Sequence, residues 1–228
     1  MRIKHVTLHT TALQYQQVFY HELLGFPLVK ADATSFTLQA GESTLTFRKS
    51  YDGAHIHHFA FNIPAQQFEQ AIEWALERVD LLPYHGQPYL DFSESSWDAR
   101  ALYFYDVGGN IVELIGRKRY IPHTVPSQFS MASVQCLSEI GLASPNMPIM
   151  RQALRQRLGL DVFGYNHDEF TAIGGDDGLL ILVALGRVWL PTAHAVSGLY
   201  PIELELVGQT AQDFTLAELP YTFHVCTE

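Results

Sequence analysis

Cysteine is scarce in this chain of 228 residues, which has only Cys136 and Cys226 and no CxxC spacing. This scarcity argues against a disulfide framework, and we expect buried or incidental thiols in a reducing compartment. Long apolar runs are lacking as well, because none approaches the ~20 residues that a membrane helix needs. The first residues, MRIKHVTLHT, lack the apolar stretch of a signal peptide. We therefore expect a cytoplasmic protein without a membrane partner.

Positive charge is also in short supply. The chain has 14 Lys+Arg against 24 Asp+Glu and a formal net charge of −10. Such a balance repels phosphate backbones, so nucleic acid is not expected as a partner. The local basic cluster Arg117–Arg119 is expected to be a solvated linker. Eleven histidines are the compositional feature that points to chemistry.

An internal repeat emerges when the chain is aligned with itself at an offset of 134 residues. The segment LLGFPLV (23–29) falls on RLGLDVF (157–163), SFTLQAGESTLTF (35–47) on EFTAIGGDDGLLI (169–181), and HVTLHT (5–10) on EIGLAS (139–144). Each unit has an alternating strand, a helix and further strands, in the order β-α-β-β-β. A second copy starts at HHFAFNI (57–63), a third covers 134–189, and a vestigial fourth starts at PIELELV (201–207).

These units predict an α+β fold in which tandem β-α-β-β-β units pair into curved, cup-like mixed sheets. We expect two domains: residues 1–118, built from units 1–52 and 53–118, and residues 131–228, a degenerate domain of the same type. Residues 119–130, which contain two prolines, are expected to link them.

The second half is expected to have lost its site. The offset places Glu139 at the position of His5 and Leu180 at that of Thr46. Glu203 and Glu205 alternate with apolar residues and are expected to face solvent.

Glu113 lies inside an apolar strand, IVELI (111–115), within the segment YFYDVGGNIVEL (103–114). A carboxylate there is costly unless it is paired or binds a metal. The alternative is an edge strand with Glu113 facing water.

These segments resemble the vicinal oxygen chelate superfamily, which includes glyoxalase I, bleomycin and fosfomycin resistance proteins and extradiol ring-cleaving dioxygenases. The segment YFYDVGGNIVEL is similar to the family pattern Y-x-x-D-P-x-G-N-x-x-E-L, with Val107 in place of proline. MRIKHVTL and HHFAFNI resemble the opening strands of two units. The resemblance covers residues 1–118 well and the remainder weakly. In that family, two units wrap around one divalent metal that is held by their first and last strands.

The resemblance implies a metal site of His5, His58 and Glu113. Thr46 stands where glyoxalase-type members carry a glutamate, and threonine is not a usual ligand for a divalent transition metal. The 2-His-1-carboxylate set that remains leaves open positions for substrate and O₂, and it suits Fe(II), with Mn(II) or Zn(II) as alternatives.

Further residues are implied by the same resemblance. Tyr103 matches an active-site tyrosine of extradiol dioxygenases and is the candidate catalytic residue, although it could instead be a core tyrosine. The acid/base histidine of those enzymes has no match here, and only His85 or His9 could take its part. Substrate-binding residues are unknown, with Arg100 and Arg48 as weak candidates for balancing substrate charge.

The function predicted is a metal-dependent enzyme, with extradiol-type ring cleavage of a small catechol-like substrate favoured. One alternative is a lyase or isomerase of glyoxalase type, which would need a base where Thr46 stands. Another is a non-catalytic binding protein of bleomycin-resistance type, which would hold no metal. A homodimer is left open.

Three histidines in AHIHHFAFNI (54–63) are not equivalent. Alternation along the strand puts His57 on the apolar side with Phe59, whereas His58 shares a row with Ala60 and Asn62 that suits the lining of a cup. His55 precedes the strand and is expected to be exposed.

Overall fold

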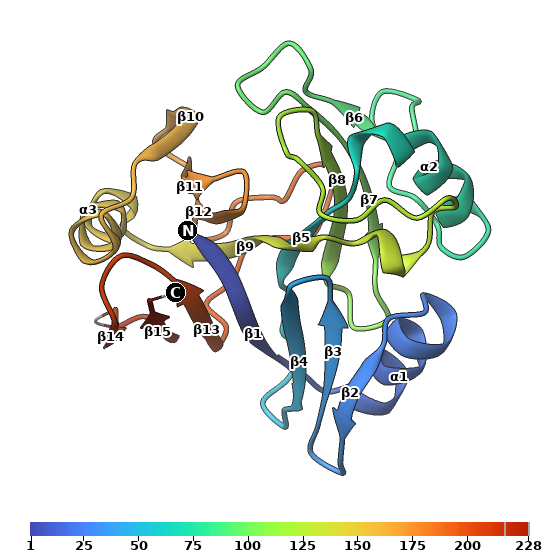
Figure 1. The fold of residues 1–228 in the computed structure, drawn as a ribbon. Coiled ribbons are helices and arrows are strands. Elements are labelled where there is room, and N and C mark those ends of the chain that lie inside the picture. The colour runs from blue at the N-terminus through green and yellow to red at the C-terminus, as the bar shows by residue number, and fades with distance from the viewer. Residues whose placement is uncertain (217, 228) are drawn as a thin grey trace.

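The computed structural model describes residues 1–216 and 218–227, which form three successive β-α-β-β-β units and a shorter fourth unit (Figure 1). The first contains β1 (Arg2–Thr10), α1 (Leu13–Gln17) with a π-helical continuation (Val18–Leu23), β2 (Leu28–Ala31), β3 (Ser35–Ala40) and β4 (Ser43–Lys49). The second contains β5 (His58–Asn62), α2 (Phe68–Leu76) preceded by a 3₁₀ turn (Ala65–Gln67), β6 (Leu90–Asp91), β7 (Ala99–Tyr105) and β8 (Ile111–Arg117).

The second half repeats this order. A 3₁₀ turn (Met131–Ser133) leads to the third unit, which contains β9 (Cys136–Ser144), α3 (Met147–Leu158), β10 (Val162–His167), β11 (Phe170–Gly175) and β12 (Gly178–Ala184). The fourth contains β13 (Ile202–Val207), β14 (Gln212–Thr215) and β15 (Tyr221–Cys226). The predicted α+β class and the repeated units are confirmed, and the fourth unit has no helix among the described residues.

The pairing of the units differs from the expected one. One sheet has the strand order β14-β15-β13-β1-β4-β3-β2, and the other has β10-β11-β12-β9-β5-β8-β7-β6. The first unit therefore pairs with the fourth, through antiparallel β1 and β13, and the second pairs with the third, through antiparallel β5 and β9. Figure 1 shows β1 (blue) beside β13 (red). The expected grouping of units 1–52 and 53–118 in one sheet is wrong, and residues 119–130 join two units of the same sheet.

Both sheets contribute to one apolar core. Val6, Leu45 and Phe223 from the seven-stranded sheet and Phe59 and Leu182 from the eight-stranded sheet belong to a single buried cluster. The opposite face of the eight-stranded sheet carries a second cluster that is rich in small side chains, including Ala60, Ala101, Ala143 and Ala172. Because alternate residues of a strand face opposite sides, each strand supplies one row to the core and one to this second face. The small side chains leave room above the sheet.

Several local predictions can be compared directly. Cys136 and Cys226 are both free thiols. Glu203 and Glu205 are partly exposed and pair with Arg48 and Lys4. No helix in residues 1–216 and 218–227 is long and apolar enough to cross a bilayer.

Candidate metal centre

Three polar side chains meet where the second and third units join. Ala60 of β5 stands opposite Glu113 of β8 on one side and opposite Glu139 of β9 on the other. Residues opposite one another in a ladder project to the same face of the sheet. His58 lies two residues before Ala60, so its side chain shares that face. The register of three strands therefore brings the imidazole and two carboxylates together.

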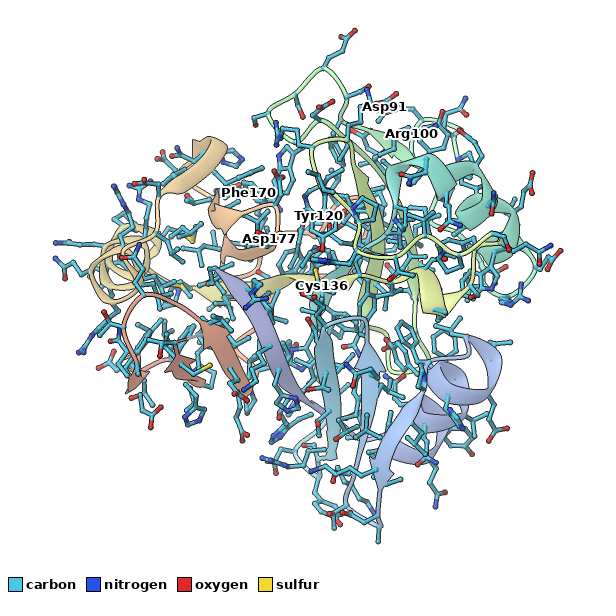
Figure 2. All side chains as sticks on the ribbon, viewed as in Figure 1. Asp91, Arg100, Tyr120, Cys136, Phe170 and Asp177 are labelled. Atoms are coloured by element: carbon cyan, nitrogen blue, oxygen red, sulfur yellow. The ribbon has the colours of Figure 1, made fainter. Side chains whose placement is uncertain are left out.

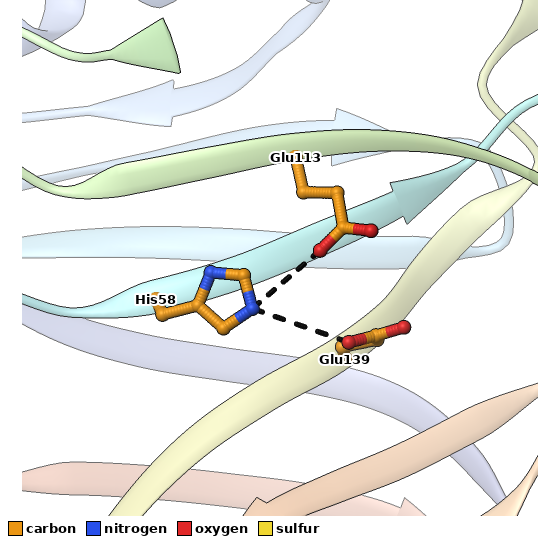
Figure 3. A group of neighbouring side chains, drawn as sticks. All are labelled: His58, Glu113 and Glu139. Atoms are coloured by element: carbon orange, nitrogen blue, oxygen red, sulfur yellow. Dashed lines mark ion pairs between the residues drawn. The ribbon is translucent and has the colours of Figure 1, made fainter. Parts of the chain in front are cut away.

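The group is compact and buried (Figure 3). His58 Nε2 lies 3.5 Å from Glu113 Oε2 and 4.0 Å from Glu139 Oε2. The ligand atoms of the three residues lie within 4.8 Å of one another, and each residue is no more than 5% exposed. Among the described residues, this is the one cluster of His, Cys, Asp or Glu with metal-ligand spacing.

The imidazole of His58 is oriented for ligation. Its Nδ1 lies 3.2 Å from the carbonyl oxygen of Ile111, which can only accept a hydrogen bond, so Nδ1 carries the proton. Burial lowers the pKa of His58 to about 4, so the ring is neutral at pH 7. Nε2 is then an unprotonated nitrogen that faces both carboxylates. A backbone carbonyl that holds the far ring nitrogen is the usual support of a metal-binding histidine.

The two carboxylates are held at a cost. Burial raises the pKa of Glu113 well above its ordinary value, and the neighbouring Glu139 raises it further, whereas Arg117 opposes the shift. Burial also raises the pKa of Glu139, and the adjoining Arg117 again opposes it. A divalent cation between the two carboxylates would remove this repulsion. The donor set of one neutral imidazole and two carboxylates therefore fits a divalent metal.

Arg117 supports this arrangement from behind. The guanidinium is fully buried, donates to Glu139 Oε1 and to Asn62 Oδ1, and lies 3.2 Å from Ser138 Oγ. Because Oε1 of Glu139 is taken by Arg117, Oε2 is the oxygen left facing His58. The prediction that Arg117 belongs to a solvated linker is wrong, since it is the last residue of β8 and forms part of the interior.

One corner of the site is apolar. In the second unit, Glu113 stands opposite Ala60, which lies two residues after His58. In the third unit, Ile181 of β12 stands opposite Gly141, which lies two residues after Glu139. Ile181 therefore occupies in the third unit the place that Glu113 has in the second. A metal held by His58, Glu113 and Glu139 would keep open coordination positions on the side of Ile181.

A cavity of about 590 Å³ lies over the three residues. Its wall includes Phe92, Trp97, Tyr103, Phe170, Ile181, Arg187, Trp189 and Leu190, with His58, Glu113 and Glu139 among the lining residues. The ring of Trp189 lies 5.0 Å from that of His58, and a side chain at Gly141 would collide with it. An apolar, aromatic cavity with a few convergent polar groups is the usual form of a small-molecule site.

The predicted ligands are only partly brought together. His58 and Glu113 adjoin, but His5 lies on β1 in the other sheet. There, His5 Nδ1 lies 2.6 Å from Thr44 Oγ1 and Nε2 lies 3.1 Å from Thr7 Oγ1. The third member of the cluster is Glu139 instead, so the second half, which was expected to have lost its site, contributes a residue to the candidate centre. The offset of 134 residues, which aligns Glu139 with His5, was the signal in the sequence.

Tyr103, the predicted catalytic residue, does line the cavity. It stands opposite Glu113 in the β7–β8 ladder, and its ring stacks on that of His58 at 6.3 Å. Burial, together with Glu113 and Glu139, raises the pKa of Tyr103 well above 10. Its hydroxyl therefore stays protonated and can donate a hydrogen bond, while its catalytic role stays a prediction.

The weaker candidates lie elsewhere. Arg100 pairs with Glu69, and Arg48 pairs with Glu203 in the other sheet, 2.6 Å between Arg48 Nη1 and the carboxylate. Figure 2 shows Arg100 beside α2, well apart from Phe170 on β11. Among the described residues, neither His9 nor His85 lines the cavity, whereas His167 and Arg187 do.

His57 and His55 form a separate cluster with His9 and Tyr200. The His55 ring stacks on that of Tyr200 at 5.1 Å and on that of His9 at 6.0 Å, and His57 meets Tyr200 edge-on. His55 is buried, so the prediction that it is exposed is wrong. Burial, with smaller contributions from His55 and His9, lowers the pKa of His57 from 6.5 to about 3.

This pKa predicts acid sensitivity. The unfolded chain binds a proton at His57 near pH 6.5, but the folded chain does so only near pH 3. Stability is therefore lost as the pH falls below 6.5, and the variant His57→Phe should escape the loss. Between pH 7 and pH 4.5, we expect wild type to lose roughly 2–3 kcal/mol of unfolding free energy relative to the variant. Urea titrations of both proteins measure this, and parallel pH profiles would contradict it.

Comparisons with known proteins define the fold. No protein-family model and no curated protein matches the chain. A candidate dioxygenase from Bacillus subtilis subsp. subtilis str. 168 superposes on it with a TM-score of 0.62 and 14% identity, covering 100% of this chain and 85% of that one. Fosfomycin resistance protein FosX from Mesorhizobium loti matches 51% of this chain and 91% of its own, with 17% identity and a TM-score of 0.37.

A glyoxalase/bleomycin resistance protein/dioxygenase from Nocardioides matches 55% of this chain and 90% of its own, with 17% identity and a TM-score of 0.41. Each of these two shorter proteins matches about half of the chain. The full-length superposition shows that the two chains share a fold.

Proposed function

We propose that this chain, which has the vicinal oxygen chelate fold, is an enzyme that holds one divalent metal through His58, Glu113 and Glu139. The observation that carries the proposal is the buried pair of carboxylates on either side of a neutral imidazole, beneath an aromatic cavity. Arg117 offsets part of the cost of burying this pair, and a divalent cation would offset the rest. The substrate of this enzyme would be a small molecule that chelates the metal through two adjacent oxygens.

Within this class we propose an extradiol-type ring-cleaving dioxygenase acting on a catechol-like substrate. A bound metal would supply Lewis acidity, lowering the pKa of a substrate hydroxyl, and open positions for substrate and O₂. Fe(II) remains the proposed metal, and the second carboxylate makes Mn(II) a stronger alternative because oxygen ligands suit it.

The chain's own residues have distinct tasks in this proposal. The hydroxyl of Tyr103 would donate a hydrogen bond to a substrate oxygen beside Glu113. Trp97 and Trp189 would hold an aromatic ring and exclude water. Ile181 would keep the substrate side of the metal free of a fourth protein ligand. His167 also lines the cavity, and its Nδ1 accepts a hydrogen bond from the backbone N–H of Glu169, 3.3 Å away.

Oxygen uptake tests this proposal. The protein would be reconstituted anaerobically with Fe(II) or Mn(II), and O₂ consumption would be followed with a panel of catechols. We expect uptake that is lost in His58→Ala and kept in His5→Ala, since His5 lies in the other sheet. Metal binding without uptake would favour a glyoxalase-type lyase or isomerase. No metal binding at micromolar concentration would favour a sequestering protein and refute both enzyme proposals.

A further inference from the structure

Arg187 is the cation of the cavity over the candidate metal centre. It follows β12 in the segment that carries Trp189, and both side chains line the cavity. The residue is partly buried, and its guanidinium lies 5.4 Å from the centre of the Phe170 ring. The side chain is therefore held against an aromatic wall of the cavity, not extended into solvent.

The guanidinium of Arg187 is influenced by the charge of Glu169 but forms no ion pair with it. Among the described residues, Arg187 has no ion-pair partner, and its one hydrogen bond runs from Nη1 to the carbonyl oxygen of Val188 at 3.3 Å. Of the other partly or fully buried arginines in the described part of the chain, three are ion-paired: Arg78 with Glu77, Arg100 with Glu69, and Arg117 with Glu139. The fourth, Arg151, lies outside the cavity and donates to the side chain of Asn166. A partly desolvated cation gains most from a charge-assisted, bidentate partner. The cavity leaves that place to a ligand.

The surroundings of Arg187 define the remainder of the ligand. Phe92, Trp97, Phe170 and Trp189 give the cavity aromatic walls, which suit a planar apolar body. Apart from Glu113 and Glu139 at the metal centre, no lining residue in the described part of the chain is a carboxylate. Burial lowers the pKa of Arg187, and the nearby Glu169 opposes that shift, yet arginine keeps its charge at any physiological pH.

We propose that the cavity binds an aromatic carboxylate, with its carboxylate on the guanidinium of Arg187 and its ring between the aromatic walls. The inference rests on the proposed function only in placing the substrate's adjacent oxygens at His58, Glu113 and Glu139. Arg187 is then the residue that selects acidic over neutral aromatic substrates, a task that sequence patterns had offered to Arg100 or Arg48.

The test uses a matched pair of probes, 2-naphthoate and 2-naphthamide, which have the same ring and differ in charge. Binding is measured by quenching of tryptophan fluorescence, because Trp97 and Trp189 line the cavity. It is measured in chelator-treated protein and again with Zn(II), which has no redox chemistry. We expect the naphthoate to bind roughly tenfold or more tightly than the amide in both forms, with the preference weakening as salt is added.

The variant Arg187→Met should abolish this preference by weakening binding of the naphthoate far more than binding of the amide. Arg100→Met is the matched control, since it removes a paired arginine outside the cavity, and it should keep the preference. Equal binding of the two probes to wild type would overturn the proposal, even if Arg187→Met failed to fold. So would an equal loss for both probes in Arg187→Met. The chelator-treated measurement requires no metal, so the absence of a charge preference there would refute the role of Arg187 without bearing on the metal centre. Failure to bind Zn(II), with the preference intact, would refute the metal centre without bearing on Arg187.

Discussion

Replacing Glu113 by glutamine is expected to weaken Mn(II) binding by about a hundredfold or more and, at the same time, to stabilise the metal-free protein. The first effect follows because a ligand is lost, and even outer partners of a ligand are worth about 10- to 100-fold in affinity. The second follows because Glu113 is fully buried beside another carboxylate and has no cation of its own, unlike Glu139. Calorimetric titration with Mn(II) and thermal unfolding with chelator measure the two effects.

The opposite signs make the result informative. A variant that is merely damaged would lose both metal affinity and stability, whereas loss of affinity with a gain in melting temperature identifies a site kept for function. Glu205→Gln is the control, because Glu205 is a partly exposed carboxylate of the other sheet that pairs with Lys4. It should change neither quantity measurably. Unchanged Mn(II) affinity in Glu113→Gln would remove Glu113 from the site.

Replacing Arg117 by methionine should destabilise the protein by about 3–5 kcal/mol, because it leaves the buried carboxylate of Glu139 without its cation. Asn62 and Ser138 lose a donor at the same time. The control is Arg119→Met. Arg119 shares Asp176 as a partner but is 44% exposed, so its loss should cost no more than ~1 kcal/mol. Denaturant titrations compare the two variants.

A second change separates charge from packing. If the cost of Arg117→Met comes from the unpaired carboxylate, then adding Glu139→Gln should recover part of it, because the two effects of a contacting pair are not additive. A double variant that is less stable by the full sum of both changes would contradict this account. So would a loss below 1 kcal/mol in Arg117→Met alone.

Sequence patterns predicted the units and named two of the three residues of the candidate metal centre, but not how the units combine. The repeat and the strand around Glu113 suffice to identify a β-α-β-β-β unit, and alternation along the strand is enough to choose His58 over its two neighbours. All four units begin with similar strands, so the opening strands of any two units could pair. The order of the units along the chain favours pairing of the first unit with the second. The actual partner of β5 is β9, which brings in Glu139 and leaves His5 behind.

The surroundings of Arg117, His55 and Arg187 are also set by residues that are distant in the sequence. The basic run Arg117–Arg119 predicts a solvated linker, but the fold places Glu139 of β9 and Asp176 beside the guanidinium of Arg117. The position of His55 before a strand predicts exposure, but the ring of Tyr200, far away in the chain, stacks on it. Arg187 lies in an irregular segment without a motif, so only the folded cavity distinguishes it from the other arginines.

The central claim is that the metal lies between the second and third units. Anomalous diffraction at the manganese edge from crystals soaked in Mn(II) tests it most directly. The account predicts one strong peak within bonding distance of His58 Nε2, Glu113 and Glu139, and no peak beside His5. A peak at His5, or none among the three residues at saturating Mn(II), would contradict it.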